Sequence, residues 1–178
     1  MPEGPEVRRM SQDLASVLTE KTLEEINVLS GRYTKKDIVG LTEINRVLPT
    51  KILGAGCHGK FIYALTSSGF NIWNTLGMSG RWSKKRTKHS RVELKIREED
   101  SVYFEDIRNF GTLKYNTDPY LLSKKLDSLG MDFLKHNYNI TRFVDNFMKK
   151  KSKTIAEALM NQSICAGVGN YLKAEILY

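Results

Sequence analysis

The first six residues of the chain, Met1-Pro2-Glu3-Gly4-Pro5-Glu6, contain the residue types best suited to chemistry. Initiator methionine is removed when the second residue is small, and the mature chain would then begin with the secondary amine of Pro2. An α-amino group titrates at about 8, so part of it is unprotonated and nucleophilic near neutral pH. A secondary amine forms a cationic iminium directly with an aldehyde-like carbon, and Glu3 beside it can move protons. The opening therefore predicts an amine nucleophile with an acid/base neighbour.

The same residues also have a purely structural interpretation. Pro5 suits the first position of a helix, and Glu6 suits the positive end of the helix dipole. Apolar residues then recur at helical spacing, which predicts a helix over 5–18 with Pro2 and Glu3 exposed ahead of it. A Pro-Glu start alone is therefore weak support for catalysis, and the remaining motifs must decide.

Composition favours a globular protein with an anionic partner. The 178 residues are 40% hydrophobic, which is enough for a sizeable core, and the net charge of +8 favours nucleic acid. Cys57, Cys165 and the three histidines lack metal-ligand spacing, so we expect neither a metal nor a cofactor. No signal peptide or membrane-spanning apolar run is present, so we expect no membrane partner and an intracellular location. With a nucleic-acid partner, that location would be the nucleus, the nucleoid or a viral factory.

The pattern of short strands followed by helices predicts an α+β fold. Strand-like runs separated by glycine-containing turns indicate a β-sandwich or barrel, and the segment 54–59 is expected to be one of those turns. The predicted strands are 23–29, 51–54, 61–65, 70–76, 91–96, 102–104 and 112–115.

From Asp118-Pro119 onward the apolar spacing is helical. We predict helices over 121–129, 140–148, 154–160 and 171–178. The expected architecture is an N-terminal helix plus β-sandwich domain over 1–118, followed by an all-α domain over 119–178.

Four further segments could contribute to a site. Lys60 lies at the start of a predicted strand, and the glycine-flanked turn 76–80 would push Met78 outward. Arg108 and Phe110 are two positions apart, hence on the same side if that segment is extended. The glycine-rich turn before the last helix places Asn170 in the N-cap position.

These five segments, in this order, resemble the formamidopyrimidine-DNA glycosylase / endonuclease VIII family of base-excision-repair enzymes. The Pro-Glu-Gly-Pro-Glu opening and the stretch 170–178 are more similar to the endonuclease VIII-like branch. The resemblance implies that Pro2 attacks C1′ of the damaged nucleotide and that Glu3 is the acid/base residue that helps to open the sugar. Glu6 matches a further acid near the site.

The resemblance also implies DNA-binding roles. Lys60 matches the active-site lysine that contacts phosphate beside the lesion, Asn170 matches the asparagine of the helix–two-turns–helix motif that binds phosphate, and Lys153 lies where the family often has a lysine. Met78, Arg108 and Phe110 match the residues that fill the gap left by the everted base; apolar and aromatic wedges can replace the lost stacking. The helix N-terminus before Asn170 is expected to offer free N–H groups to a phosphate. Taken singly, these residues suit a core position, a solvated lysine or a helix cap, and only their ordered set favours function.

The function implied is a bifunctional DNA glycosylase and AP (apurinic/apyrimidinic) lyase that acts as a monomer on damaged DNA, duplex or single-stranded. It would remove oxidised pyrimidines, or alternatively 8-oxoguanine, through a Pro2 iminium and β,δ-elimination. The alternatives are a catalytically weak paralogue that binds damaged or single-stranded DNA, and a basic RNA-binding module. Family members continue beyond the region matched here with a zinc or zincless finger. Because the sequence stops at Tyr178, we expect that finger and its phosphate-binding arginine to be absent.

Overall fold

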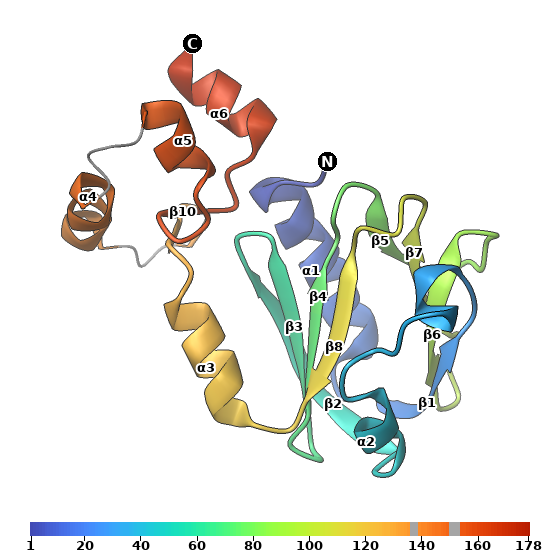
Figure 1. Cartoon of the computed structure of the whole chain (residues 1–178). Coiled ribbons are helices and arrows are strands. Elements are labelled where there is room, and N and C mark those ends of the chain that lie inside the picture. The colour runs from blue at the N-terminus through green and yellow to red at the C-terminus, as the bar shows by residue number, and fades with distance from the viewer. Residues whose placement is uncertain (136–138, 150–153) are drawn as a thin grey trace.

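The chain is built from a strand-rich unit followed by a helical segment (Figure 1). The computed structural model describes residues 1–135, 139–149 and 154–178. The strand-rich unit contains, in chain order, α1 (Gly4–Leu18), β1 (Thr22–Val28), η1 (Gly31–Thr34), α2 (Leu41–Asn45), β2 (Thr50–His58), β3 (Phe61–Thr66), β4 (Asn71–Thr75), β5 (Gly80–Ser83), β6 (Ser90–Ile96), β7 (Val102–Asp106) and β8 (Thr112–Asn116).

Helix α1 confirms the predicted N-terminal helix and places the first residues of the chain at the site. It begins one residue earlier than predicted, directly after Glu3, with Pro5 in its first turn. One face is buried at Val7, Leu14 and Leu18, because these residues recur at helical spacing. This face packs on the sandwich and contacts β2.

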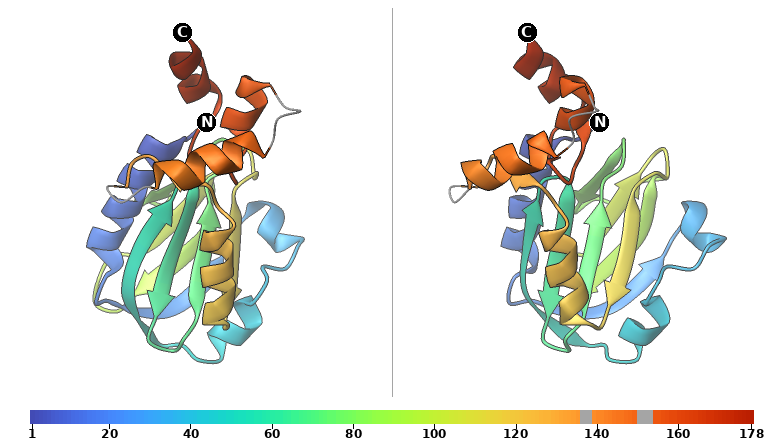
Figure 2. Two further views of the ribbon diagram at one scale, coloured as in Figure 1. Left: turned by 90° about the vertical axis from the view of Figure 1, so that its left-hand side faces the viewer. Right: turned by 60° about the vertical axis from the view of Figure 1, so that its left-hand side comes forward.

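The eight strands form a continuous antiparallel arrangement in the order β5-β7-β6-β1-β2-β3-β4-β8. Only two residue pairs join β1 to β2, whereas each half is paired more extensively within itself. The halves β5-β7-β6-β1 and β2-β3-β4-β8 form two layers (Figure 2). One hydrophobic cluster contains residues of both layers, among them Ile62, Ile72, Val92 and Phe104, which confirms the predicted sandwich.

In this unit one local prediction is wrong and one strand was not predicted. Strand β2 continues to His58, so 54–58 is strand and the turn is confined to Gly59 and Lys60. Gly56 faces Tyr63 across the β2–β3 ladder, where its missing side chain leaves room for the tyrosine ring. Strand β5 was not predicted, because a four-residue run gives too little alternation to detect.

The helical segment contains α3 (Pro119–Asp127), α4 (Ile140–Met148), α5 (Ile155–Met160) and α6 (Asn170–Leu177), as predicted to within a few residues. It is not purely α-helical, because the short strands β9 (Met131–Asp132) and β10 (Cys165–Ala166) pair in parallel. A second hydrophobic cluster, which includes Leu159 and Ile164, lies entirely after residue 118. This separation is consistent with the predicted boundary, which stays a prediction.

Among the described residues, none of the helices is both long enough and apolar enough to cross a membrane.

Candidate active site

The carboxylate of Glu3 is buried and holds the start of α6. The Glu3 side chain is only 1% exposed. Its Oε2 accepts the backbone N–H groups of Gly169 at 2.7 Å and Leu172 at 3.2 Å, and Oε1 accepts that of Tyr171 at 3.0 Å. The first helical turn has N–H groups without intrahelical partners, and here the acid satisfies three of them. Glu3 is therefore fixed in position. The prediction that Glu3 is exposed is wrong.

Glu6 lies beside Glu3 and completes this network. Its Oε2 accepts the backbone N–H of Glu3 at 2.9 Å, and its two oxygens accept the hydroxyl of Tyr171 at 2.9 and 3.0 Å. Burial raises the pKa of Glu6, but the hydrogen bonds from Glu3 and Tyr171 outweigh it and hold the pKa below its usual value. Glu6 is thus the direct neighbour of the Pro2-Glu3 peptide.

Close backbone contacts between three glycines bring the site together from distant parts of the chain. The N–H of Gly4 donates to the carbonyl of Gly167 at 2.8 Å. Gly59, in the β2–β3 turn, has φ +55°, and a Cβ on it would lie 2.5 Å from the backbone nitrogen of Gly167. Only glycine tolerates both that conformation and that approach. The start of α1, the turn that carries Lys60 and the loop before α6 therefore meet at one point.

Lys60 and Pro2 line the same cavity of about 270 Å³. Its walls include Met1, Phe61, Leu76 and Gln162. Lys60 is partly buried, and this burial lowers the pKa of its ammonium, although the charge of Glu3 opposes the shift. The cavity thus brings Pro2, the predicted nucleophile, and the cation of Lys60 together.

Gly169 lies directly against both charged groups of the site, Glu3 and Lys60. A Cβ at this position would lie 2.2 Å from Glu3 Oε1 and 2.6 Å from Lys60 Nζ. The carboxylate and the ammonium therefore both reach the N-terminus of α6 at a point where no side chain fits. The sequence did not predict that Gly169 leaves space for Glu3 and Lys60, because the only signal of Gly169 in the sequence is that it belongs to a glycine-rich turn.

The predicted void-filling residues lie on two loops at the end of the sandwich nearest the cavity. Met78 is 42% exposed and Phe110 is 58% exposed, and Arg108 Nη1 lies 3.6 Å from Met78 Sδ. A Cβ on Gly77 would lie 2.6 Å from the backbone of Gly111, so the two loops touch. Gly77 also lines the cavity of Pro2, which places these loops beside it.

Asp106 holds the two loops together, and the sequence analysis assigned it no role. Its buried carboxylate accepts the hydroxyl of Ser79 at 2.6 Å and the backbone N–H groups of Arg108 at 3.2 Å and Gly111 at 2.7 Å. Asn109 adopts φ +56°, so 107–111 is a loop and not an extended strand. The segment is therefore not extended, and the condition under which Arg108 and Phe110 were expected to share a side is not met.

Asn170 is exposed at the start of α6, but one prediction about it is wrong. The N-cap residue is Gly169, and Asn170 is the first helical residue. The N–H groups of Gly169, Tyr171 and Leu172 are occupied by Glu3, so the helix end does not offer them to a phosphate. The exposed side chain of Asn170 accepts a hydrogen bond from Lys173 Nζ at 3.3 Å on its Oδ1, and its Nδ2 can still donate to a phosphate.

Lys153 lies outside the described residues. Within the described ranges, no group of three or more His, Cys, Asp or Glu side chains could hold a metal ion.

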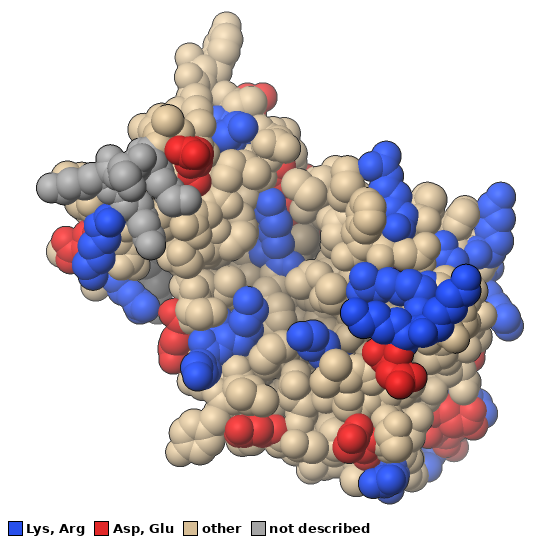
Figure 3. Space-filling view, viewed as in Figure 1, with Lys and Arg blue, Asp and Glu red and all other residues tan. Residues whose placement is uncertain are grey.

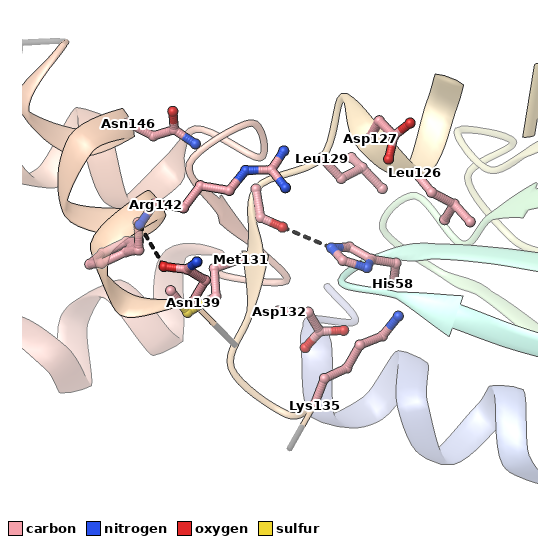
Figure 4. A pocket seen from close by; sticks show the side chains of 12 residues that line it. His58, Leu126, Asp127, Leu129, Met131, Asp132, Lys135, Asn139, Arg142 and Asn146 are labelled. Carbon is pink, nitrogen blue, oxygen red and sulfur yellow. Dashed lines mark hydrogen bonds between the residues drawn. The ribbon is translucent and has the colours of Figure 1, made fainter. Parts of the chain in front are cut away.

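A second cavity, of about 350 Å³, lies between the end of β2 and the helical segment (Figure 4). His58, Asp132, Asn139 and Arg142 line it, and His58 Nε2 lies 2.8 Å from the carbonyl oxygen of Gly130. Within the described ranges, none of the predicted site residues lines this cavity.

Lys and Arg side chains flank the hollow between the helical segment and the loops of the sandwich (Figure 3). This distribution agrees with the net charge of +8 and favours an anionic ligand on this face.

Comparison with known proteins identifies the family. Residues 1–113, more than half of the chain, match the formamidopyrimidine-DNA glycosylase N-terminal domain. Curated formamidopyrimidine-DNA glycosylases of Streptococcus pneumoniae and Salinispora tropica are 29% and 28% identical over the whole chain, which spans 66% and 64% of their lengths.

Solved structures share the fold. The MutM (Fpg) protein of Thermus thermophilus superposes with a TM-score of 0.79 at 26% identity, covering 99% of this chain and 63% of that one. The Lactococcus lactis enzyme, solved non-covalently bound to DNA that contains an AP site, superposes with a TM-score of 0.82 at 22% identity, covering 99% of this chain and 67% of that one. The chain therefore belongs to the formamidopyrimidine-DNA glycosylase family.

Proposed function

We propose that this protein is a base-excision-repair DNA glycosylase with AP lyase activity whose nucleophile is the amine of Pro2. The observation that carries the proposal is the placement of Pro2 in a cavity with Lys60, directly before a Glu3 carboxylate fixed by three backbone N–H groups. An enzyme needs its acid/base group held rigidly beside the nucleophile, and this arrangement meets that need. Such an enzyme works inside the cell, where its substrate is.

The proposed reaction starts once removal of Met1 has freed the Pro2 amine. The amine attacks C1′, the bond from C1′ to the damaged base breaks, and the base leaves with a proton. Glu3 then helps to transfer a proton to O4′ of the sugar as the bond from C1′ to O4′ breaks. This opening of the sugar leaves a cationic iminium between Pro2 and C1′. Loss of a C2′ proton then expels the 3′ phosphate, and a second elimination expels the 5′ phosphate.

The proposed substrates are oxidised pyrimidines in DNA, as for the endonuclease VIII-like branch. The support is the resemblance of the Pro-Glu-Gly-Pro-Glu opening and of the stretch 170–178 to that branch. The curated relatives named above carry the formamidopyrimidine name, so 8-oxoguanine and formamidopyrimidine lesions are the competing substrates to be assayed in parallel.

The direct test is borohydride trapping on duplex DNA with an abasic site. The wild-type protein should form a covalent adduct, because borohydride reduces the iminium to a stable amine. Pro2→Gly should weaken trapping, and an uncleavable N-terminal extension should abolish it, because the nitrogen of Pro2 is then an amide.

Pro5→Ala is the matched control, since Pro5 is exposed in the first turn of α1. An adduct of undiminished yield from the extended protein would show that Pro2 is not the nucleophile. DNA binding without any adduct would instead favour the catalytically weak binding paralogue.

The DNA-binding residues are expected to divide into two groups with different salt dependence. Lys60→Ala should make the dependence of log K on log salt shallower by about one unit at most, because one phosphate contact is lost. Phe110→Ala should leave that slope unchanged and weaken binding by about 1–3 kcal/mol through lost stacking. Fluorescence titration of lesion duplexes at several salt concentrations measures both quantities.

Lys51→Ala is the matched control for Lys60, because Lys51 lies on β2 at the end far from the Gly59-Lys60 turn and pairs with Glu20. Equal changes of slope in Lys60→Ala and Phe110→Ala would contradict the division of roles.

A further inference from the structure

Tyr171 joins both acids of the candidate site, and the family resemblance assigned it no role. Its backbone N–H donates to the side chain of Glu3, while its hydroxyl donates to both carboxylate oxygens of Glu6. Glu6 Oε2 in turn accepts the backbone N–H of Glu3. Tyr171 therefore anchors the side chain of Glu3 directly and the backbone of Glu3 through Glu6.

This anchoring reaches the nucleophile through the peptide that links Pro2 to Glu3. A peptide unit is planar, so fixing the N–H of Glu3 fixes the whole plane up to the Cα of Pro2. The pyrrolidine ring is itself rigid. Only the rotation about the Cα–C bond of Pro2 then remains between the anchored plane and the amine.

We propose that Tyr171 is a positioning residue for the Pro2 amine and acts through the carboxylate of Glu6. The inference rests on the proposed function, because it concerns the geometry of the same nucleophile. The observation that supports the inference independently is a continuous path of hydrogen bonds. It runs from the Tyr171 hydroxyl to the Glu6 carboxylate and from that carboxylate to the N–H of Glu3.

The protonation states of Tyr171 and Glu6 keep these hydrogen bonds intact at neutral pH. Burial and the hydrogen bond to Glu6 raise the pKa of Tyr171 to about 12, so its hydroxyl keeps the proton that it donates. The groups that lower the pKa of Glu6 against the effect of burial are the N–H of Glu3, the Tyr171 hydroxyl, the N–H of Glu6 itself and the N-terminal ammonium of Met1. Loss of the hydroxyl should therefore raise the pKa of Glu6 towards its usual value.

The test compares Tyr171→Phe with wild type in single-turnover trapping on abasic-site DNA. Phenylalanine keeps the ring and the backbone N–H to Glu3 and removes only the hydroxyl. We expect the rate of adduct formation at saturating DNA to fall about tenfold, as for loss of one hydrogen bond to a charged group, with the Kd for DNA unchanged. Tyr120→Phe is the matched control, because Tyr120 is 83% exposed on α3.

Two further measurements distinguish positioning through Glu6 from general loosening of the fold. The acidic limb of the pH–rate profile should move to higher pH in Tyr171→Phe, and a carbon-13 titration of the free protein should show the Glu6 carboxyl titrating at higher pH. In a Glu6→Gln background, Tyr171→Phe should have little additional effect, because the two residues act along one path.

The outcomes separate this inference from the proposed function. A wild-type protein that forms no adduct contradicts the proposed function itself. A wild-type adduct with an unchanged rate in Tyr171→Phe overturns the role of Tyr171 alone. An undiminished effect of Tyr171→Phe in the Glu6→Gln background would likewise overturn it.

Discussion

Glu3→Gln is expected to lower the rate of base removal from lesion duplexes at least about 100-fold, which is the usual contribution of a positioned acid/base group. Glutamine has nearly the same size but cannot exchange a proton with the opening sugar. An abasic site has already lost its base, and its sugar exists partly as an open aldehyde. Adduct formation with abasic DNA should therefore fall much less than base removal, and single-turnover rates on the two substrates measure the difference.

The same substitution should also destabilise the fold. The amide has one acceptor oxygen in place of two, so one backbone N–H among those of Gly169, Tyr171 and Leu172 would face an NH₂ group. Leaving a buried donor unsatisfied costs about 1–3 kcal/mol in unfolding free energy. Glu43→Gln on exposed α2 is the control for both assays. Equal losses on lesion and abasic DNA would show that Glu3 does not act mainly in opening the sugar.

Gly169→Ala is expected to disable the site more completely than removal of Lys60 alone. The new methyl group would lie 2.2 Å from Glu3 Oε1 and 2.6 Å from Lys60 Nζ, so both groups must move. Lys60 has a flexible side chain, but Glu3 is buried and can move only by giving up its N–H donors. We expect the trapping rate to fall by about 100-fold, because small displacements of catalytic groups cost that much.

Denaturant unfolding and trapping of the same protein separate the two consequences of Gly169→Ala. The lost hydrogen bonds should lower the unfolding free energy by about 3 kcal/mol. Gly54→Ala is the matched control, because a Cβ on Gly54 would meet nothing within 4 Å and its φ is not positive. A fully active Gly169→Ala protein would show that Glu3 does not need its position at the start of α6.

The local sequence determined most of the secondary structure and the order of the motifs. Helix α4 begins and ends at the predicted residues, and β6 alternates between buried and more exposed side chains from Val92 to Ile96, because periodic apolar spacing reports which face is buried. The Pro2-Glu3 pair and the position of Lys60 after a turn could be read from adjacent residues. Each of these features depends on neighbours within about two turns of helix or one strand.

Only the tertiary structure decided which groups meet. The N–H that binds Glu3 belongs to Gly169, 166 residues along the chain, and no spacing rule links the two. That contact turned an expected exposed acid into a buried one and occupied the helix end expected to bind phosphate. Similarly, the shape of the Phe110 loop follows from the buried carboxylate of Asp106, not from strand geometry. The physical reason is that local patterns specify elements, whereas the polar groups at their ends are satisfied by whichever partners packing brings within reach.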